Sequence, residues 1–409
     1  MTRPTSLSFI VTTYDILPYL GRCLASLAAC ARPGDRVIVV DDGSTDGTAD
    51  RLESLLEQAG FDPGVALQPI LLGTNTIGGV GIAGNTGLSA ALSDPGCATV
   101  FFVDGDDWLD PAGFRACRRA FEAAPSDILI ANYAEYDEAG DSHRRPADAA
   151  LWARVRHLPA GDTEAARRLA LRMIAVPWRK FYRADFLRTH RLRFPEGDFF
   201  FEDNPFHWEV CLKAGSIAFH DRVLCQHRIN RPGQTMASTG TELSAFFTHY
   251  DTIRASLRAA RPEGADELEA AALTWLLNNM SWHVARLRPG AFWPYAARAA
   301  RVLAAVPDPV WQTVAPSFAE RAIGQVAGAL RQGDVTGIVG IWMQAAQMAE
   351  IAALRERVAA LEAGQTALAE GLPRALERTE RQVSALQEIQ RFQALTALPD
   401  PKADEEGGR

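Results

Sequence analysis

The sequence predicts an α/β fold in which helices flank a mostly parallel sheet. Short apolar runs alternate with segments of helical periodicity over about the first 125 residues. Strands of parallel sheets have this apolar character because helices cover both of their faces. Three of the runs end in polar clusters, at residues 12–14, 41–42 and 104–107. Because sheets of this kind bind ligands beyond the carboxyl ends of their strands, we expect a functional site there.

The first half supplies the expected sheet in order. Strands are expected at residues 7–12, 36–40, 66–72, 100–103 and 127–136. A helix opens at Pro18 after the first strand, and Asp46 is placed to cap the helix after the second. A Gly-rich crossing at 73–87 leads into a helix at 83–92. Asp110 and Pro111 are suited to an N-cap and a first helical position, which predicts a helix soon after the fourth strand.

The segment that follows is less regular. Residues 144–157 are polar and basic, and we expect a loop there with a strand near 151–155. Helices are expected at 162–174, 184–190 and 205–214, and a strand at 223–225. The periodicity of these short runs indicates a continuation of the same α/β layer.

The loop after the fourth strand carries three carboxylates. Asp104, Asp106 and Asp107 lie within four residues and repel one another unless a cation lies between them. Oxygen ligands at this spacing suit a hard divalent ion, Mg²⁺ or Mn²⁺. The alternative is an acidic turn that only caps the next helix, because Asp and Gly are ordinary turn residues. The polar clusters at two other strand ends favour the functional interpretation.

Composition narrows the class of protein. The chain of 409 residues has a formal net charge of −8, which argues against a nucleic-acid-binding protein. Its six cysteines form no CxxC pair and are expected to be buried thiols in a reducing compartment. The N-terminus lacks a signal-like segment, and no run of 18 apolar residues occurs. We therefore expect a cytoplasmic enzyme that meets a membrane only through its surface, at the inner face.

Four motifs together resemble the family-2 glycosyltransferases of GT-A fold. They are Leu-Ser-Phe-Ile-Val-Thr-Thr-Tyr at 7–14, Val-Ile-Val-Val-Asp-Asp-Gly-Ser-Thr-Asp-Gly-Thr at 37–48, Gly-Asn-Thr-Gly-Leu at 84–88 and Phe-Val-Asp-Gly-Asp-Asp-Trp-Leu at 102–109. The resemblance covers about residues 5–235. It implies a nucleotide-sugar donor, with a UDP-sugar favoured, and a transfer that inverts the anomeric configuration.

The resemblance also implies roles for individual residues on the donor side. Thr12 and Tyr14 would cradle the base, and Asp42 with Asp41 would bond it. The three acids of the loop would hold Mn²⁺ or Mg²⁺ on the diphosphate, with Asp104 also near the donor, and Asn85 belongs to the same donor site. The chain departs from the family at two positions. Thr12 stands where Pro is frequent, and Gly84 stands where Arg is frequent before the Asn.

On the acceptor side, Glu202 and Asp203 follow three phenylalanines at the start of an expected helix. One interpretation is a simple N-cap. The other is a general base in an aromatic-walled cleft, which an acceptor hydroxyl needs because it is weakly acidic. The pair resembles the family's Glu-Asp motif, in which the Asp is the base.

Two further stretches resemble the subgroup that builds bacterial capsular and cell-envelope polysaccharides, Trp-x-Lys-x-Tyr-Arg at 178–183 and His-Arg-x-x-Arg-x-Gly at 227–233. By this resemblance Trp178 and Glu202 would serve the acceptor. Lys180, His227 and Arg228 would serve the donor, and one of the cations Lys180 and Arg228 would replace the missing Arg. A strand-end histidine without a ligand is the alternative for His227.

The C-terminal third is expected to be helical. Residues 239–345 are rich in Ala, Leu and Arg, and their aromatic residues fit either a packing module or a membrane-surface patch. From residue 351 a heptad repeat can be written, which predicts a partial coiled coil over 346–395 that forms a homo-oligomer or docks a partner. Its a positions are Ile351, Val358, Gln365, Leu372, Thr379 and Leu386, and its d positions are Leu354, Leu361, Leu368, Ala375, Gln382 and Ile389. Gly364, Gly371 and Pro373 interrupt it, and residues 396–409 are expected to be disordered.

The sequence therefore predicts a glycosyltransferase domain at 1–238, with a nucleotide-binding half at 1–125 and an acceptor half at 126–238. The expected reaction moves a sugar from a nucleotide sugar to a hydroxyl of a glycan or lipid-linked acceptor in cell-surface polysaccharide synthesis. Two alternatives remain open at this point. One is a nucleotidyl- or glycerophosphotransferase on the same fold, and the other is a non-catalytic scaffold that assembles through the coiled coil.

Overall fold

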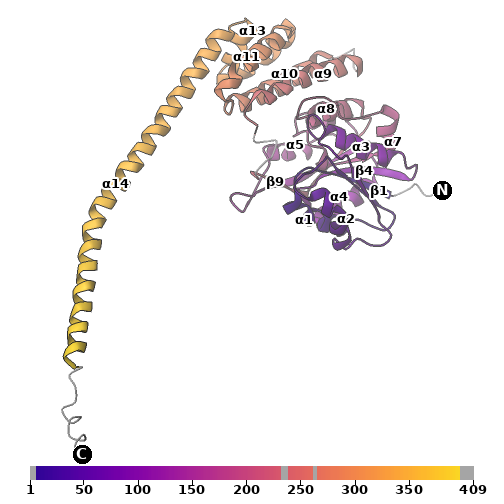
Figure 1. Ribbon diagram of the computed structural model, residues 1–409. Coiled ribbons are helices and arrows are strands. Elements are labelled where there is room, and N and C mark those ends of the chain that lie inside the picture. The colour runs from indigo at the N-terminus through magenta and orange to yellow at the C-terminus, as the bar shows by residue number, and fades with distance from the viewer. Residues whose placement is uncertain (1–5, 232–237, 261–264, 397–409) are drawn as a thin grey trace, which may run out of the picture. The chain divides into compact units, whose positions relative to one another are not determined.

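The computed structural model describes residues 6–231, 238–260 and 265–396. Its contacts divide the chain into two units, Met1–Val339 and Gly340–Arg409. The first unit contains the sheet, its flanking helices and a group of helices that follows the sheet (Figure 1). The second unit consists, in its described part, of one long helix.

A mixed sheet of nine strands organises the first unit. The strand order is β3-β2-β1-β4-β8-β6-β9-β5, and β7 pairs with β6 outside this path. The strands β1 to β4, which are mutually parallel, confirm the expected parallel half, and β8 joins β4 in the antiparallel sense. The strands are β1 (Ser6–Thr13), β2 (Arg36–Asp41), β3 (Ala66–Leu71), β4 (Cys97–Asp104), β5 (Trp108–Leu109), β6 (Ile128–Asp137), β7 (Ser142–Arg144), β8 (Lys180–Arg183) and β9 (Ile217–Ile229).

The register of the central strands aligns their carboxyl ends. Thr12 of β1 lies opposite Asp104 of β4, and Thr13 lies opposite Asp41 of β2. Three polar strand ends therefore meet at one edge, as the sequence predicted.

Helices cover both faces of this half of the sheet (Figure 1). On one face α1 (Leu17–Ala28), α2 (Thr48–Gln58) and α4 (Pro111–Ala123) bury a cluster that includes Phe9, Phe101 and Phe114. On the other face lie α3 (Gly81–Leu92), α7 (Ala184–His190) and α8 (Asp203–Lys213). Because successive side chains of a strand point to opposite faces, Phe102 contacts this second layer through Phe194 and Phe206.

Most of the predicted elements are present within a few residues, and the cap predicted at Asp110 is confirmed, while Asp162 caps another helix that was predicted without a cap. The carboxylate of Asp110 accepts a hydrogen bond from Gly113 N at the start of α4, and that of Asp162 accepts one from Ala165 N at the start of α6 (Thr163–Ala170). The six cysteines are buried free thiols, as expected.

The prediction of a strand near residues 151–155 is wrong. The chain there forms a 3-10 turn, η1 (Ala149–Leu151), and a short helix, α5 (Trp152–Val155). The preceding Asp148 is buried, accepts a hydrogen bond from Ile174 N and pairs with Arg179 at 2.5 Å. These long-range contacts fix the turn, and an alternation over five residues carries too little information to predict it.

The helical region after the sheet contains five α-helices in its described part. They are α9 (Ala245–Ala260), α10 (Ala265–Val284), α11 (Pro289–Ala304), α12 (Asp308–Val314) and α13 (Ala322–Arg331). The 3-10 turns η2 (Pro177–Arg179), η4 (Thr241–Ser244) and η5 (Ala315–Phe318) complete the first unit. Phe292 and Tyr295 are buried in this region while Trp293 is exposed, so the aromatic residues serve mainly helix packing.

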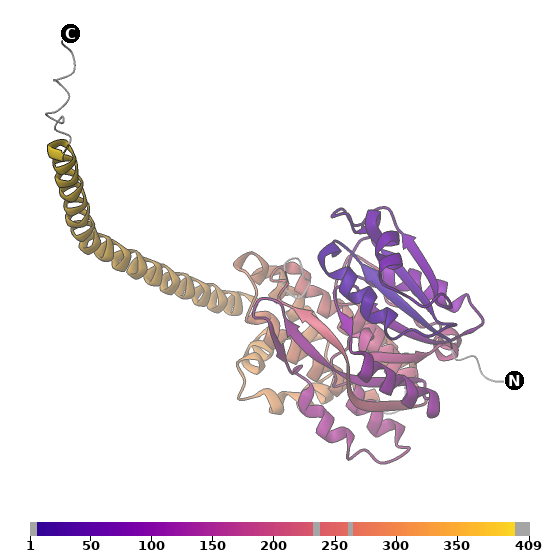
Figure 2. The ribbon, with the colours of Figure 1, turned by 90° about the horizontal axis from the view of Figure 1, so that it is seen from below.

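The long helix α14 (Val335–Thr396) is continuous through Gly364, Gly371 and Pro373 (Figure 2). The break that the sequence predicted at these three residues is therefore wrong, because none of them ends the helix. Between Val335 and Ala394 it contains an 18-residue window with a mean hydropathy of 1.2, which satisfies length and composition for a membrane span. Counting unbroken apolar runs did not anticipate this, and one such helix is weak evidence for a span. Of the tail expected to be disordered, Thr396 belongs to α14 and residues 397–409 lie outside the described residues.

Candidate functional site

The site begins where β1 and β2 end. The carboxylate of Asp41 accepts hydrogen bonds from Thr13 Oγ1 at 3.0 Å and from Ser44 N at 2.9 Å, which fixes the loop after β2. Gly43 in this loop has a φ of +73°, and a Cβ there would lie 2.2 Å from the backbone of Thr74. The residue must therefore be glycine, because no side chain fits this close approach.

Asp42 holds a second loop in place. Its carboxylate accepts hydrogen bonds from Asn75 Nδ2 at 3.2 Å and from Thr76 Oγ1 at 2.9 Å. Burial raises the pKa of Asp42, and the hydrogen bonds from Thr76 oppose this. Tyr14 on the neighbouring strand end is 46% exposed. The predicted base-binding residues therefore comprise a buried carboxylate engaged with its own loop and an exposed aromatic ring.

The acidic loop after β4 is surrounded by basic groups of β9 and the residues that follow it. Asp107 accepts hydrogen bonds from Arg228 N at 2.7 Å and from the His227 ring, whose Nδ1 lies 2.9 Å from its carboxylate. The Asp106 carboxylate pairs with Arg231, and its backbone oxygen accepts a hydrogen bond from Arg228 Nε at 2.9 Å. Two cationic side chains, His227 and Arg231, thus pair with two of the three acids, while the Arg228 guanidinium forms its ion pair with Glu138.

The electrostatics of this cluster are set by burial and by the acids themselves. Burial raises the pKa of Asp104 well above its ordinary value, and Asp107 and Asp106 raise it further. Burial alone would lower the pKa of His227, but the three acids outweigh it and raise the pKa to about 9. His227 therefore carries a proton at neutral pH unless a metal ion replaces it, because a metal ligand must be deprotonated.

A metal ion fits this cluster. Asp104, Asp107 and His227 each offer a ligand atom, and these atoms lie within 4.8 Å of one another. Two carboxylates and one imidazole suit Mn²⁺ better than Mg²⁺, which prefers oxygen ligands. The structure groups His227 with the acids, whereas Asp106, the third ligand expected from the sequence, directs its carboxylate to Arg231.

Trp178 packs against the His227 side chain of this cluster. Its ring stacks on the His227 ring with centroids 4.7 Å apart, and Tyr133 packs edge-on against it at the same distance. Trp178 is buried, 3% exposed. Its contacts orient the His227 ring, whereas the sequence assigned it to the acceptor.

The Glu202-Asp203 pair lies at the start of α8 and is deeply buried. Glu202 is the N-cap residue by position but makes no capping hydrogen bond through its side chain, and Asp203 is the first helical residue. Phe201 before them has a φ of +68°, a strained conformation for a bulky residue. The side chain of Glu202 therefore does not cap the helix, whereas backbone N–H groups of the first turn, those of Asp203 and Asn204, lower the pKa of Asp203.

Both carboxylates of the pair are shifted toward the protonated form. Burial raises the pKa of Glu202 to about 7, and its Oε1 has no hydrogen-bond partner among the described residues. Burial also raises the pKa of Asp203, while the charge of Lys180 lowers it. A Cβ on Gly79 would lie 2.6 Å from Glu202 Oε1, so the Gly-rich loop 78–81 closes directly over this carboxylate.

Lys180 is the one cation acting on this pair within the described residues. It is fully buried, and its Nζ donates hydrogen bonds to the carbonyl oxygens of Ala175 at 2.9 Å and Val176 at 2.6 Å. Burial lowers the pKa of Lys180 to about 7. A half-charged, fully buried ammonium gives Asp203 little compensation, so Asp203 keeps the raised basicity that a general base needs.

The helical region contributes residues that the sequence did not single out. His249 of α9 is buried, and its ring lies 2.6 Å, through Nε2, from the carbonyl oxygen of Phe200. Phe246 of the same helix packs against Phe201 with ring centroids 4.7 Å apart, and Trp275 Nε1 donates to Asn204 Oδ1 at 3.3 Å. These contacts hold the segment before α8. A lone histidine in an amphipathic helix gives no sequence signal for such a role.

Asn85 joins α3 to the segment after α7. Its Nδ2 donates to the carbonyl oxygen of Phe194 at 2.9 Å and to Glu196 at 2.7 Å, and its Oδ1 accepts a hydrogen bond from Phe194 N. A Cβ on Gly84 would lie 3.1 Å from the Phe194 ring. The Phe194 ring therefore occupies the space that a side chain such as Arg would need at residue 84.

The N-terminal half of the chain matches known proteins. Residues 8–191 match the model of the family described as "Glycosyl transferase family 2". Relatives include an "Uncharacterized glycosyltransferase EpsJ" of Bacillus subtilis, 27% identical over 223 residues, which cover 54% of this chain and 61% of the relative. "Glycosyltransferase GlyA" of Streptococcus pneumoniae is 24% identical over 55% of this chain and 31% of its own length. The chain thus spans less than two thirds of either relative.

Solved structures share the fold. The crystal structure of S. aureus TarS 1-349 in complex with UDP-GlcNAc has a TM-score of 0.59 and 21% identity, covering 84% of this chain and 92% of that chain. The crystal structure of S. aureus TarS has a TM-score of 0.61 and 20% identity, covering 82% of this chain and 54% of that chain. These likenesses confirm the GT-A fold expected from the sequence.

Proposed function

We propose that the chain transfers a sugar from a nucleoside diphosphate sugar to a hydroxyl group, with inversion, because residues 8–191 match the model of the family described as "Glycosyl transferase family 2". The proposed donor is a UDP-sugar, because the shared fold binds UDP-GlcNAc in TarS. The proposed acceptor is a glycan or lipid-linked glycan of a cell-surface polysaccharide. Such an acceptor would place the enzyme in the cytoplasm, at the inner face of the membrane.

The proposal depends on one observation. Two buried groups of acids differ in how their charge is compensated, and the charge of one group affects the pKa of the other. The charge of Asp203 is among the groups that raise the pKa of Asp104. The first cluster is compensated by cations, as a diphosphate and metal site requires. The second cluster has less compensation, and burial raises the pKa of its Asp203.

The chemistry follows from the residues. Asp104, Asp107 and His227 would hold a divalent cation, whose contribution is to neutralise the charge that develops on the leaving nucleoside diphosphate. Arg228 and Arg231 add positive charge on the same side. Asp203 would remove the proton from the acceptor hydroxyl as its oxygen attacks the anomeric carbon opposite the leaving group. A single displacement of this kind needs no covalent intermediate and inverts configuration.

The decisive experiment separates donor binding from proton removal. Binding and slow hydrolysis would be measured for a panel of UDP-, GDP- and TDP-sugars in Mn²⁺, Mg²⁺ or EDTA. For the donor that binds, Asp203→Asn should retain the dissociation constant and lose about 10²–10⁴-fold in turnover, the range typical of a lost general base. Asp198→Asn, an exposed carboxyl five residues earlier, is the matched control and should retain both.

Each adverse outcome has a distinct meaning. Donor binding without hydrolysis or transfer in the wild type, with candidate acceptors present, would favour the scaffold. Retained turnover in the Asp203→Asn variant would favour a nucleotidyl- or glycerophosphotransferase that needs no base at this position. Absence of donor binding would refute the donor site.

A further inference from the structure

Helix α14 carries a stripe of exposed apolar side chains. Of the twelve a and d positions of the heptad repeat, eight hold large apolar residues, and all eight are exposed in the described chain. Their exposed fractions range from 42% at Ile351 to 74% at Leu361. The eight are Ile351, Leu354, Val358, Leu361, Leu368, Leu372, Leu386 and Ile389. Removing apolar side chains of this size from water is favourable, so the stripe favours a partner.

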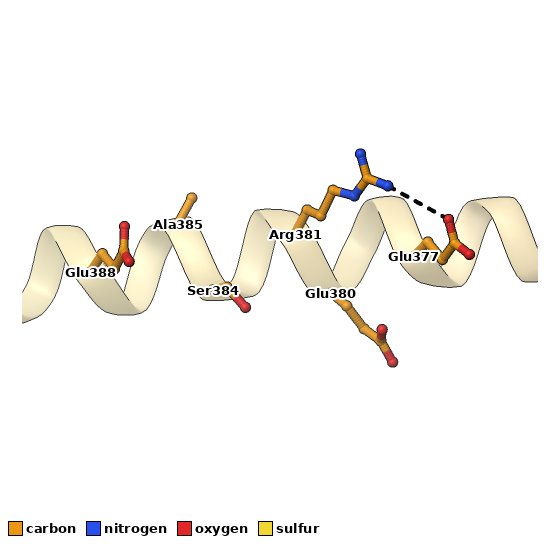
Figure 3. A pocket seen from close by; sticks show the side chains of 6 residues that line it. All are labelled: Glu377, Glu380, Arg381, Ser384, Ala385 and Glu388. Atoms are coloured by element: carbon orange, nitrogen blue, oxygen red, sulfur yellow. Dashed lines mark ion pairs between the residues drawn. The ribbon is translucent and has the colours of Figure 1, made fainter.

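Between residues 377 and 388 the face of the helix opposite the stripe is polar and mainly acidic. Figure 3 shows Glu377, Glu380, Arg381, Ser384, Ala385 and Glu388 around a shallow hollow, which belong to heptad positions other than a and d. One ion pair, Arg381 to Glu377 at 3.7 Å, lies among them. A single helix lines this hollow, so it has the character of a solvated surface. Within residues 350–375 the b, c and f positions hold mainly alanine, with Glu356, Glu370 and Arg374 as the charged residues. Helices that lie on membranes carry many Lys and Arg on their polar face, and the lack of such a cluster here argues against a lipid surface as the partner.

The residues at a and d favour two parallel strands. In the first two heptads the a positions are the β-branched Ile351 and Val358, and the d positions are Leu354 and Leu361. β-Branched residues at a with Leu at d favour parallel dimers, because of how each side chain packs into the facing helix. Gln365 occupies the next a position, where a polar residue fixes register at some cost in stability.

The flanking charges specify the direction and register of the partner. In a parallel, in-register pair, a g residue of one helix faces the e residue of the next heptad in the other helix. With a at Ile351, Glu350 at g then faces Arg355 at e, and Arg357 at g faces Glu362 at e. Both contacts are attractive between identical chains, and symmetry provides each of them twice. Charge complementarity of the chain with itself thus points to a second copy as the occupant.

We propose that residues 350–375 of α14 form a parallel, in-register, two-stranded coiled coil with a second copy of this chain. The inference is independent of the transferase reaction, because it depends only on the heptad residues of the long helix. Its failure would leave the donor and acceptor assignments unchanged.

The first test is the mass of the full chain in solution. Sedimentation equilibrium should give twice the chain mass of 44.5 kDa for the wild type. Leu354→Ala with Leu361→Ala should raise the dimer dissociation constant at least about 100-fold, since core leucines that become alanines commonly cost more than tenfold each. The matched control is Glu356→Ala with Glu370→Ala, two exposed residues at f positions of the same segment, which should remain dimeric. A monomeric wild type at tens of micromolar, or an equal loss in the control, would overturn the proposal.

The second test uses charge reversal at the e and g positions. One variant carries Glu350→Arg with Arg357→Glu, and a second carries Arg355→Glu with Glu362→Arg. Each alone places like charges opposite each other in a parallel pair and should be weakened at least about tenfold, because e and g charges set partner choice. An equimolar mixture should recover a heterodimer, in which every facing pair is attractive. Failure of the mixture to associate would refute the assigned register.

The third test fixes direction. Leu354→Cys and Leu368→Cys, made separately, should each form a disulfide with the same residue of the partner under mild oxidation, because in-register d positions face each other. Ser384→Cys on the polar face is the control and should remain reduced. The native cysteines are buried and do not interfere. In an antiparallel pair at most one of the two positions could link to itself, and that result would overturn the proposal. Binding to anionic vesicles with loss of the dimer would overturn it as well.

Discussion

The acidic loop after β4 and the Glu-Asp pair at the start of α8 differ in how their charge is compensated. In the loop, Asp107 pairs with His227 and Asp106 with Arg231, and the charges nearly balance. In the pair, Glu202 Oε1 has no hydrogen-bond partner among the described residues, and Asp203 has a buried lysine whose own pKa falls to about 7.

This difference fits the two tasks that we propose for these regions, donor binding at the loop and proton removal at the pair. A site for a polyanion and a metal ion must present charge without repelling itself, and it does so with facing cations. A base must hold a proton more tightly than an ordinary carboxylate, and burial without full compensation achieves this. Substitutions that remove a carboxylate, a cation or a supporting side chain from either region test whether this difference in charge compensation matters for function.

The largest expected effect comes from removing one carboxylate of each region. Asp107→Asn should abolish metal-dependent donor binding and turnover together, because it breaks the cluster with Asp104 and His227. Asp203→Asn should lower turnover by about 10²–10⁴-fold with donor affinity unchanged. Calorimetric titration of donor in Mn²⁺ and steady-state kinetics measure the two quantities. If the two variants lost donor affinity and turnover to the same extent, the two regions would not have separate tasks.

The second effect is a pH-dependent difference in stability at Glu202. Burial raises the pKa of Glu202 in the folded protein to about 7, above its ordinary value of 4.5, so ionisation destabilises the folded state as pH rises through this range. Glu202→Gln removes the penalty. Its unfolding free energy relative to wild type should therefore increase by about 3 kcal/mol between pH 4.5 and pH 8.

Urea unfolding in EDTA at four pH values measures this difference, with Asp198→Asn as the control expected to stay parallel to wild type. A difference for Glu202→Gln that does not change with pH would show that the carboxyl is ionised at no cost, and the pair would then be compensated like the loop.

A third effect concerns the support of the pair by α9. Burial lowers the pKa of His249 to about 4, so the neutral ring donates from Nε2 to the Phe200 carbonyl at neutral pH. His249→Phe leaves that carbonyl without its donor, which typically costs about 1–3 kcal/mol for a buried group. We expect turnover to fall about tenfold with donor affinity unchanged, since a displaced base loses alignment.

The readout that separates positioning from general destabilisation is the ratio of kcat to KM effects at a temperature well below the unfolding midpoint. His190→Phe on the surface of α7 is the control and should leave kcat as in wild type. An increase in the donor dissociation constant instead of a fall in kcat would assign His249 to the donor side.

The smallest expected effect is at Arg231. Arg231→Gln removes one cation from the loop and should weaken donor binding about threefold to tenfold, in the range expected for one partly exposed charge. Because ionic screening weakens exposed pairs, the difference from wild type should shrink as salt rises from 50 to 500 mM. Binding that is unchanged at low salt would mean that the loop is compensated without Arg231.

The sequence by itself determined the layered fold and the strand ends that carry polar residues, and it singled out the Glu-Asp pair as a candidate. These features are local: apolar runs mark buried strands, and acids directly after them lie at the carboxyl edge of a parallel sheet. The heptad stripe of α14 is equally local, but the break predicted at its glycines and proline does not occur.

Only the tertiary structure decided which groups face one another. Asp107 and His227 are separated by 120 residues in sequence, and His249 and Phe200 by 49. No local pattern encodes such pairs, because the contacts arise where separate elements pack. For the same reason, the structure revealed that His227 joins Asp104 and Asp107 while Asp106 turns to Arg231, and that the Phe194 ring takes the space a side chain would need at Gly84. Burial, which sets the pKa values of Glu202 and Asp203, likewise depends on what the rest of the chain places around them.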